Sequence, residues 1–543
     1  MSCMSLKISS TIVALLAATS AFAQVGKDTV LKGTTIEVIQ SYKPEVKMAP
    51  KKEYVATTPP ADTTRAKLVY DIPQQALFYT YSSLPLRPLA LGKDSVKLPF
   101  GNYVKLGFGN LNTIYFDAGF GGLKGTNYET AFHLHHLSQK GNIENQKTAT
   151  SGLEAEGTYH SARNDWHAKL IWNRNQLGYY GYDHNVYEYN NRDSVNQVFN
   201  LIRVMADMQP AVGEFRKFSY NPGINFSSYG DIHSASETSF GFNLPFYYNV
   251  DSIQFTLGVS GVFTQYNVSP FISENNNIAQ VNPGLRFNQN GFGGHVFIRP
   301  TFGKNNSYLL PDIMARYQIP NSQFIISAGW NAQLRRNTYE ELSRYNPFMF
   351  NRFNVVQTRA DEVFGSIQTN LGNHVNFGAR LSWWQYRHLP LFLNDTFDQK
   401  QFYIVHDGKV NAISFQANAR YQVNTTFSLG MNVMFNGFTT TDEQEAWHEP
   451  AVRLGADFLL RPIPQLNINA YLAVLDGIKA YNIYNQVVNT RGVFDLGAGV
   501  EYSFMPRLSA FIQMNNILNN RYERWLGQPS YGFNIYGGLR LKF

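Results

Sequence analysis

The sequence is poor in cysteine, in charge and in long apolar runs, and each shortage excludes a class of protein. Its single cysteine is Cys3, so disulfides and thiol chemistry are excluded for the rest of the 543 residues. Beyond residue 23, no run approaches the roughly 18 consecutive apolar residues that a membrane-spanning helix needs. Charged residues make up only 16%, the formal net charge is +7, and no dense Lys/Arg tract occurs, so no nucleic-acid partner is expected.

The motifs of catalysis are missing as well. The sequence has no nucleophile motif, no glycine-rich phosphate loop and no Cys/His metal spacing. His133, His135 and His136 lie together, with the first two on one face of an expected strand, and a polar lumen lining is favoured there over a metal site. Glu154 and Glu156 form an inward pair that a wet lumen accommodates without acid–base catalysis. We therefore predict no enzyme activity, no metal site and no cofactor.

The first 23 residues have the features of a secretory leader. Lys7 precedes an apolar run, and Ala21-Phe22-Ala23 is a small-x-small cleavage site, so residues 1–23 are interpreted as a signal peptide. Residues 24–99 carry eight prolines among Lys, Thr and Asp. Proline at this density disfavours helices and central strands. We interpret residues 24–99 as a periplasmic extension, which is either a plain linker or a segment that threads into the next domain or docks a partner.

From residue 100 to the end, apolar and polar residues alternate with the period of a β-strand. The last thirteen residues read YGFNIYGGLRLKF, and Phe533, Ile535, Leu539, Leu541 and Phe543 fall on one face. The opposite face carries amides, charges and glycine, so it would make a poor dry core. A soluble sandwich strand can alternate in the same way, but many such strands behind a secretory leader predict a barrel with an apolar outside and a polar inside.

Short and long connections alternate along this region. Short turns occur near residues 161, 250, 320, 372, 424, 463 and 505, whereas the connections 178–194, 339–360, 392–410, 437–449 and 519–530 are long. In outer-membrane barrels the short turns face the periplasm and the long loops face outward. The predicted fold class is all-β: a transmembrane antiparallel β-barrel of about 22 strands over residues 100–543, closed by the strand that ends at Phe543.

The C-terminal segment resembles that of the TonB-dependent receptors. Its features are a strand from Phe511, the run NNILNNRY that ends at Tyr522, and then Trp525, Gly527 and Pro529 before the last strand. The stretch YVKLGFGN at residues 103–110, with SYKP at 41–44, is similar to TonB-receptor-like barrels of Bacteroidota. Receptors of this family carry a globular plug of well over a hundred residues, and residues 24–99 are too short and too proline-rich to look like one. The nearest candidate for a TonB-docking box is the extended piece at residues 35–39.

Aromatic residues make up 15% of the chain, and many of them lie in two of the long connections. Tyr and Phe give a large contact area at low entropic cost, so these side chains are candidates for recognition of a partner or a glycan at the outer surface. The alternative is a girdle at the membrane interface. The candidates are Tyr179, Tyr180, Tyr182, Tyr187 and Tyr189 in one connection, and Tyr345, Phe348, Phe350 and Phe353 in the other.

The resemblance implies substrate uptake across the outer membrane of a Gram-negative cell. A barrel this wide needs closure, which the extension or another protein would supply. The alternative hypothesis is a plugless relative that serves as a scaffold subunit of an outer-membrane assembly. The partners expected are outer-membrane lipid, the barrel assembly machinery, and TonB or a surface lipoprotein.

Overall fold

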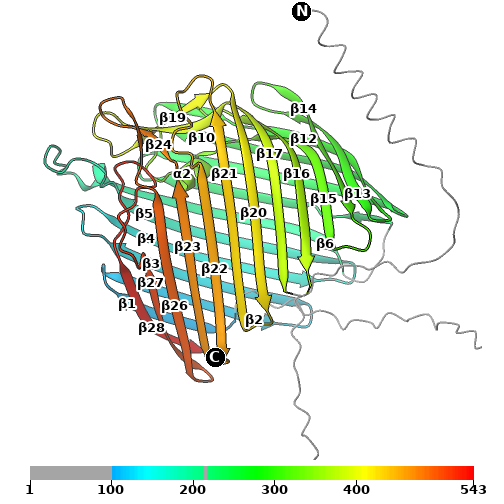
Figure 1. The fold of residues 1–543 in the computed structure, drawn as a ribbon, viewed down its shortest axis with the longest axis horizontal. Coiled ribbons are helices and arrows are strands. Elements are labelled where there is room, and N and C mark those ends of the chain that lie inside the picture. The colour runs from blue at the N-terminus through cyan, green and yellow to red at the C-terminus, as the bar shows by residue number, and fades with distance from the viewer. Residues whose placement is uncertain (1–100, 212–216, 373) are drawn as a thin grey trace, which may run out of the picture. The chain divides into compact units, whose positions relative to one another are not determined.

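The computed structural model describes residues 101–211, 217–372 and 374–543, which form a closed antiparallel barrel (Figure 1). The interpretations of residues 1–23 and 24–99 lie outside the described residues. The segments of the barrel sheet are β1 (Tyr103–Gly109), β2 (Thr113–Lys124), β3 (Tyr128–Lys140), β4 (Lys147–His160), β5 (Asn164–Gly178), β6 (Asn196–Pro210), β7 (Phe218–Tyr220), β8 (Gly223–Asp231), β9 (Ala235–Val250), β10 (Ile253–Val268), β11 (Ile272–Asn275), β12 (Ile278–Gln289), β13 (Phe292–Phe302), β14 (Ser307–Gln318), β15 (Phe324–Arg335), β16 (Thr358–Leu371), β17 (Val375–Arg387), β20 (Val410–Val423), β21 (Phe427–Thr439), β22 (Val452–Ile463), β23 (Leu466–Asp476), β26 (Val493–Met505), β27 (Leu508–Asn515) and β28 (Asn534–Lys542).

These 24 segments make 22 barrel strands. Both β7 and β8 pair with β9, and both β11 and β12 pair with β10, so each of these two couples is one interrupted strand. Every other strand pairs with the strands that precede and follow it in the barrel, and β28 pairs with β1. The predicted antiparallel barrel of about 22 strands is therefore confirmed.

One side of the barrel wall is apolar and exposed. In β10, Ile253, Phe255 and Leu257 are each 41–50% exposed, although large aliphatic and aromatic side chains are normally buried in a water-soluble protein. The intervening positions point to the lumen because neighbouring residues of a strand alternate between the two faces. An apolar outer face and a closed ladder of backbone hydrogen bonds are what a lipid bilayer requires, so this barrel is built to span an outer membrane.

A row of aromatic rings marks one edge of the apolar face. Tyr128 pairs with Tyr159, and Tyr159 pairs with Trp166, at the turn ends of β3, β4 and β5. All three side chains are about half exposed. Tyr and Trp favour the boundary between lipid and water, because one part of the ring system is apolar and the other is polar. These residues therefore belong to an interfacial girdle.

The barrel closes where its first and last strands meet. Seven residue pairs run from Tyr103 opposite Lys542 to Gly109 opposite Tyr536, and glycine faces glycine where Gly107 meets Gly538. On the lumen side of this seam, Glu501 accepts from Lys105 at 2.8 Å and from Arg540 at 2.9 Å. In and just after β28, the exposed outward side chains are Ile535, Leu539, Leu541 and Phe543, whereas Phe533 precedes the strand and is half buried.

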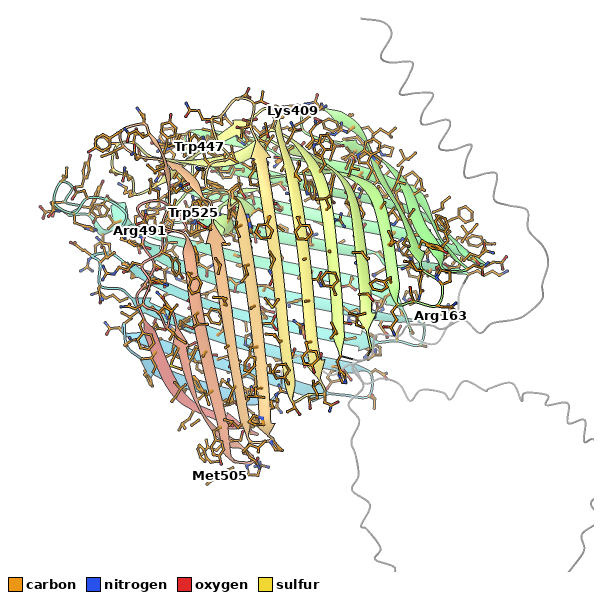
Figure 2. All side chains as sticks on the ribbon, in the orientation of Figure 1. Arg163, Lys409, Trp447, Arg491, Met505 and Trp525 are labelled. Atoms are coloured by element: carbon orange, nitrogen blue, oxygen red, sulfur yellow. The ribbon has the colours of Figure 1, made fainter. Side chains whose placement is uncertain are left out.

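Short turns and long loops lie at opposite ends of the barrel. Met505 lies at the short-turn end and Trp447 and Trp525 at the other (Figure 2). By the usual asymmetry of such barrels, the long-loop end is extracellular. No helix in the described part of the chain is long and apolar enough to cross a membrane. The elements within the long loops are η1 (Arg192–Val195), α2 (Tyr339–Tyr345), β18 (Leu389–Asn394), β19 (Phe402–Asp407), β24 (Lys479–Tyr481) and β25 (Val487–Asn489).

Candidate functional site at the extracellular mouth

Five long loops meet one another at the extracellular end of the barrel, and we call them the loop cluster. The cluster consists of residues 179–195 between β5 and β6, 336–357 between β15 and β16, 388–409 between β17 and β20, 440–451 between β21 and β22, and 516–533 between β27 and β28. Three of these loops come from neighbouring hairpins between β15 and β22, whereas the loop between β5 and β6 leaves the wall nearly opposite the loop between β17 and β20. Contacts between those two loops therefore cross the mouth of the barrel.

Two loops from opposite sides of the ring are bonded directly. Tyr187 donates its hydroxyl hydrogen bond to the carbonyl oxygen of Phe397 at 2.7 Å. Tyr189 donates to Oδ2 of Asp398 at 2.5 Å. The first partner of each bond follows β5 and the second follows β17, so these two bonds span the extracellular mouth.

Asp398 is the electrostatic centre of this crossing. Its carboxylate also pairs with the ammonium of Lys400 at 2.8 Å, and that ammonium lies 4.0 Å from the ring centroid of Tyr189. Burial by itself would raise the pKa of Asp398. The hydrogen bonds from Lys400 and Tyr189 outweigh that effect and hold the pKa below its usual value. The carboxylate is therefore charged when the loops are closed, and its negative charge strengthens both bonds.

An apolar core lies between three of the loops. Trp525 is buried, and its ring centroid lies 5.3 Å from Phe392, 5.5 Å from Phe402 and 5.7 Å from Tyr345, all in edge-on arrangements. Edge-on aromatic pairs contribute about 0.5–1.5 kcal/mol each beyond the area they bury. The loop cluster is therefore packed like a small domain core.

The short helix α2 is held at its N-terminus by the barrel wall. Thr338 and Glu341 form a capping box, which ends the run of β structure and begins the helix. Glu237 of β9 accepts hydrogen bonds from the backbone nitrogens of Tyr339 at 2.6 Å and Glu340 at 3.4 Å. A carboxylate at this position satisfies free backbone donors and complements the positive end of the helix dipole.

Further contacts fix α2 against β6 and β8. Arg203 of β6 pairs with Glu340 at 2.5 Å, and the hydroxyls of Tyr229 in β8 and Ser343 lie 2.7 Å apart. Tyr339 donates to Oδ2 of Asp231 at 2.7 Å. Because α2 belongs to the connection between β15 and β16, it reaches across the lumen to a distant part of the wall.

His448 is buried at the junction of three loops. Its Nδ1 bonds to the carbonyl oxygen of Phe392 at 2.7 Å, and its own carbonyl oxygen accepts from Arg524 at 2.6 Å. Burial lowers the pKa of the imidazole to about 3, and the nearby guanidinium of Arg524 adds to that effect. The ring is therefore neutral at physiological pH, which makes its Nδ1–H the donor to Phe392.

Most of the aromatic residues predicted for surface recognition are turned into the loop cluster. Three tyrosines of the first loop and one phenylalanine of the second are buried, and the others are partly covered or exposed. The buried ones are Tyr179, Tyr180, Tyr182 and Phe353, the partly covered ones are Tyr187, Tyr189, Phe348 and Phe350, and Tyr345 is 38% exposed. The structure brings them together as contacts between loops, and recognition by the exposed ones stays a prediction.

A cavity of about 360 Å³ lies on the lumen side, directly beneath these loops. Its wall is made by the inward side chains at the extracellular ends of β15, β17, β20, β21 and β22. Tyr345 of α2 and Leu389 of the loop between β17 and β20 cover it. Two further cavities, of about 500 and 160 Å³, share Arg335 with it. The cavities of about 360 and 500 Å³ fall in the range of small-molecule sites.

The wall of this cavity combines flat aromatic faces with charge. Trp384 and Tyr386 of β17 stack nearly parallel, with centroids 5.4 Å apart and planes at 6°. The guanidinium of Arg335 lies 6.0 Å from the first ring and 5.9 Å from the second. These three residues were missed in the sequence analysis. The signal was there, since two aromatic residues two apart on the lumen face of a strand depart from the polar lining expected.

The histidine and glutamate groups expected to line the lumen have partners in the wall. His133 bonds to Asp117 at 2.9 Å, and Glu154 pairs with Lys169 at 2.8 Å. His136 lies on the other face, where it bonds to Ser151 at 2.8 Å. Glu156 lies 3.9 Å from the ammonium of Lys169, and the ring of His135 stacks on that of His133. Within the described ranges, no group of three or more His, Cys, Asp or Glu side chains is placed to hold a metal ion.

Comparison with known proteins identifies the fold. The sequence matches no protein-family model and no curated protein. Among solved structures, the FrpB iron transporter of Neisseria meningitidis (F3-3 variant) has a TM-score of 0.65 at 13% identity, over 82% of each chain. The siderophore receptor PirA of Acinetobacter baumannii has a TM-score of 0.62 at 9% identity, over 81% of this chain and 80% of that one. The ferripyoverdine receptor of Pseudomonas aeruginosa has a TM-score of 0.59 at 11% identity, over 82% and 72%.

These structures are transporters and receptors of the outer membrane rather than enzymes. Sequence identity this low shows similarity of fold alone. The barrel therefore has the fold of the TonB-dependent siderophore receptors, and the resemblance predicted from the C-terminal segment is confirmed at that level.

Proposed function

We propose that this protein, a barrel with the fold of outer-membrane siderophore receptors, takes part in the uptake of a small-molecule substrate, and that the loop cluster is the gate at its extracellular mouth. The observation that carries the proposal is the pair of bonds from Tyr187 and Tyr189 to residues 397 and 398 across the mouth, above a lumen that contains cavities. A substrate that enters from outside has to separate these loops. The closed arrangement is then one of two states of the gate.

The contacts of the cluster are suited to opening. They are hydrogen bonds, buried carboxylates such as Asp398 and Asp407, and aromatic packing, and each single contact contributes only a few kcal/mol. A ligand can shift the loops from the closed to the open state only if the free-energy difference between these states is no larger than the difference between the ligand's binding free energies to them. The barrel wall, by contrast, is a continuous ladder of backbone hydrogen bonds. The loops can therefore rearrange while the barrel stays intact.

A scaffold subunit of an outer-membrane assembly is the second candidate function, and one surface feature favours it. The hairpin of β24 and β25 carries Ile483, Tyr484 and Val487, which are all exposed at the extracellular end. An exposed apolar group next to polar loops is typical of a protein–protein contact. A protein of the outer-membrane assembly is the partner that this surface would contact in a scaffold. The partners that the uptake proposal includes are a surface lipoprotein and TonB, which would dock at residues 35–39.

Growth of a deletion strain on single carbon and iron sources tests uptake directly. Loss of growth on one source, restored by expression of the intact gene, supports the proposal. Equal growth on every source, together with mislocalised outer-membrane proteins, would overturn it in favour of the scaffold. Mass spectrometry of proteins that copurify with the tagged chain distinguishes the partners: TonB or a surface lipoprotein for uptake, the barrel assembly machinery alone for a scaffold.

Cross-linking tests the gate during growth on the carbon or iron source that the deletion strain fails to use. In a Cys3→Ser background, Tyr187→Cys and Phe397→Cys are joined by a cleavable bis-maleimide. Growth on that source is expected to stop when the link forms and to resume after cleavage. The matched control is Tyr484→Cys with Gln486→Cys, which links two positions of one hairpin. The gate is refuted if both links have the same effect, or if neither has any.

A further inference from the structure

The cavity beneath α2 carries an excess of one positive charge. Arg335 is exposed to the lumen and has no carboxylate within ion-pair distance among the described residues. By contrast, Arg336 pairs with Glu341, and Arg359 on the neighbouring strand pairs with Asp361. Among the described residues, its hydrogen-bond partner is the side-chain oxygen of Gln333, a neutral amide, which accepts from Nε at 3.2 Å and from Nη2 at 2.8 Å. The edge of the guanidinium formed by Nη1 and Nη2 therefore remains available to an anion.

The other charges of the cavity cancel. Glu449 accepts from Arg453 at 3.0 Å and from the hydroxyl of Tyr345 at 2.7 Å. This ion pair compensates the charge of the carboxylate, and each of its two oxygens accepts a hydrogen bond. An anionic ligand at Arg335 thus meets no uncompensated negative charge from the residues that line the cavity.

Arg335 is oriented by the aromatic pair next to it. Its guanidinium lies about equally far from the rings of Trp384 and Tyr386, at 6.0 and 5.9 Å, and a cation at such distances from ring faces is attracted to them. The two rings lie in nearly parallel planes with their centroids 5.4 Å apart, and both residues line the cavity. A ligand group bonded to the guanidinium therefore has aromatic side chains beside it.

Two hydrogen-bonding groups of the same cavity have no partner within the described chain. They are Oγ of Ser414 and Nε of Arg453, and both residues line the cavity. Buried donors are normally bonded, and each one left unbonded costs about 1–3 kcal/mol. Gln416 and Asn436 add neutral amides to the lining. The lining of the cavity is therefore polar as well as aromatic.

We propose that this cavity binds an organic carboxylate attached to a six-membered ring that has an apolar face, with the carboxylate on the guanidinium of Arg335 and that face against the aromatic side chains of Trp384 and Tyr386. A carboxylate matches a guanidinium in two parallel hydrogen bonds, which is stronger and more directional than a bond to a neutral group. A volume of about 360 Å³ accommodates a ring of this kind with its substituents. Aromatic acids and acidic sugars share this chemistry. The inference rests on the proposed function, because it names the class of substrate that the gate would admit.

Titration of the full-length protein in detergent tests the site. The probes are benzoate and D-glucuronate, with benzamide and D-glucose as their neutral analogues, and binding is measured by calorimetry. At least one acid is expected to bind and its neutral analogue to bind at least tenfold more weakly. Binding of benzoate alone identifies aromatic acids as the class, and binding of glucuronate alone identifies acidic sugars.

Three variants locate the binding. Arg335→Gln is expected to weaken it at least tenfold, since it removes a charge-assisted pair, and Trp384→Leu about fivefold or more. Arg316→Gln is the matched control. Arg316 is another exposed arginine of the wall, it has no carboxylate partner in the part of the chain that the structure describes, and it lines a different cavity near the short turns. Its effect is expected to stay below twofold. Heat-modifiable migration in gels shows that each variant is folded.

The site is refuted if neither acid binds the intact protein, if the neutral analogues bind as well, or if Arg316→Gln weakens binding as much as Arg335→Gln. Failure of the proposed function looks different. In that case the deletion strain grows normally on every source, while purified protein still binds the acid. Loss of growth on one source together with no binding of either acid refutes the site and leaves uptake standing.

Discussion

Tyr189 and Asp398 share a 2.5 Å hydrogen bond although they belong to loops that leave the barrel wall on opposite sides. The bond therefore reports whether the mouth is closed. Neither residue is near the other in sequence, and both lie outside the barrel strands. Disturbing this contact should change the loops and leave the barrel unaffected.

Tyr189→Phe removes the hydroxyl and keeps the ring over Lys400. Loss of a hydrogen bond to a charged acceptor that is partly screened by solvent should destabilise the closed loops by about 1 kcal/mol. Backbone amides in residues 179–195 and 388–409 are expected to exchange hydrogen about fivefold faster, and those of the barrel strands at the original rate. Tyr220→Phe is the control, because its hydroxyl bonds to Asn164 at the other end of the barrel. Equal exchange in both variants would mean that the crossing bond does not hold the loops.

Acid should open the loop cluster through His448. The pKa of its imidazole is about 3 in the closed loops, against about 6.5 when it is exposed. The open state therefore binds the proton first, and stability of the closed state is lost progressively as pH falls from about 6.5 toward 3. At pH 5 the loss is about 2 kcal/mol. Cleavage of residues 440–451 by an added protease should be faster at pH 5 than at pH 7, relative to cleavage of a peptide with the same sequence.

His448→Gln distinguishes protonation of His448 from nonspecific unfolding at low pH. Glutamine keeps a donor near the carbonyl of Phe392 and does not titrate, so most of the pH dependence should disappear. A weaker pH dependence of cleavage should remain in this variant because of His406 in β19. Burial, with His388 nearby, lowers the pKa of His406 to about 4. If the variant kept the full pH dependence, His448 would not be the group responsible.

The two faces of β20 should respond oppositely to the same charge. Ala417 and Asn418 are consecutive, with the first on the lipid side and the second on the lumen side. Ala417→Arg is expected to lower the free energy of unfolding by about 2–4 kcal/mol, as arginine does at the bilayer midplane. Asn418→Arg should change it by less than about 0.5 kcal/mol. Urea unfolding from lipid vesicles measures both, and similar losses would place the membrane boundary elsewhere.

The seam between β1 and β28 depends on a glycine. A Cβ on Gly538 would collide with the backbone of Leu106 and Gly107, whereas a Cβ on Gly437 of β21 meets nothing within 4 Å. Gly538→Val should therefore cost more than about 4 kcal/mol and prevent closure, since the backbone cannot give way without breaking the ladder. Gly437→Val should fold normally. The fraction of heat-modifiable protein in gels is the measurement, and a fully folded Gly538→Val barrel would contradict the seam geometry.

The barrel could be predicted from the sequence because the pattern that specifies each strand lies within a few consecutive residues. Alternation such as that of Ile253, Phe255 and Leu257 assigns one face of a strand to lipid, whichever strands are its neighbours. The number of strands followed from the spacing of short turns and long loops. The long loop at residues 477–492 was not predicted, because the sequence of its hairpin, formed by β24 and β25, resembles that of the barrel strands.

The extracellular mouth was not predictable, because its contacts join residues far apart in the chain. Nothing in the sequence near Tyr189 indicates that Asp398, more than two hundred residues later, lies at its hydroxyl. The aromatic loop residues were expected to face outward, and burial such as that of Tyr179 followed only from the meeting of loops. In the same way, only the curvature of the barrel brings β15 and β17 to one cavity. The sequence therefore did not show that this cavity is lined by Arg335, Trp384 and Tyr386 together.

The sequence by itself determined the class of fold, since period-two alternation, the absence of long apolar runs and the rhythm of turns each act over a few residues. Only the tertiary structure decided which loops cross the mouth and which side chains share the lumen cavity. The physical reason is that closing a barrel fixes the positions of all strand ends at once. Contacts between opposite sides then depend on the whole ring rather than on any segment of it.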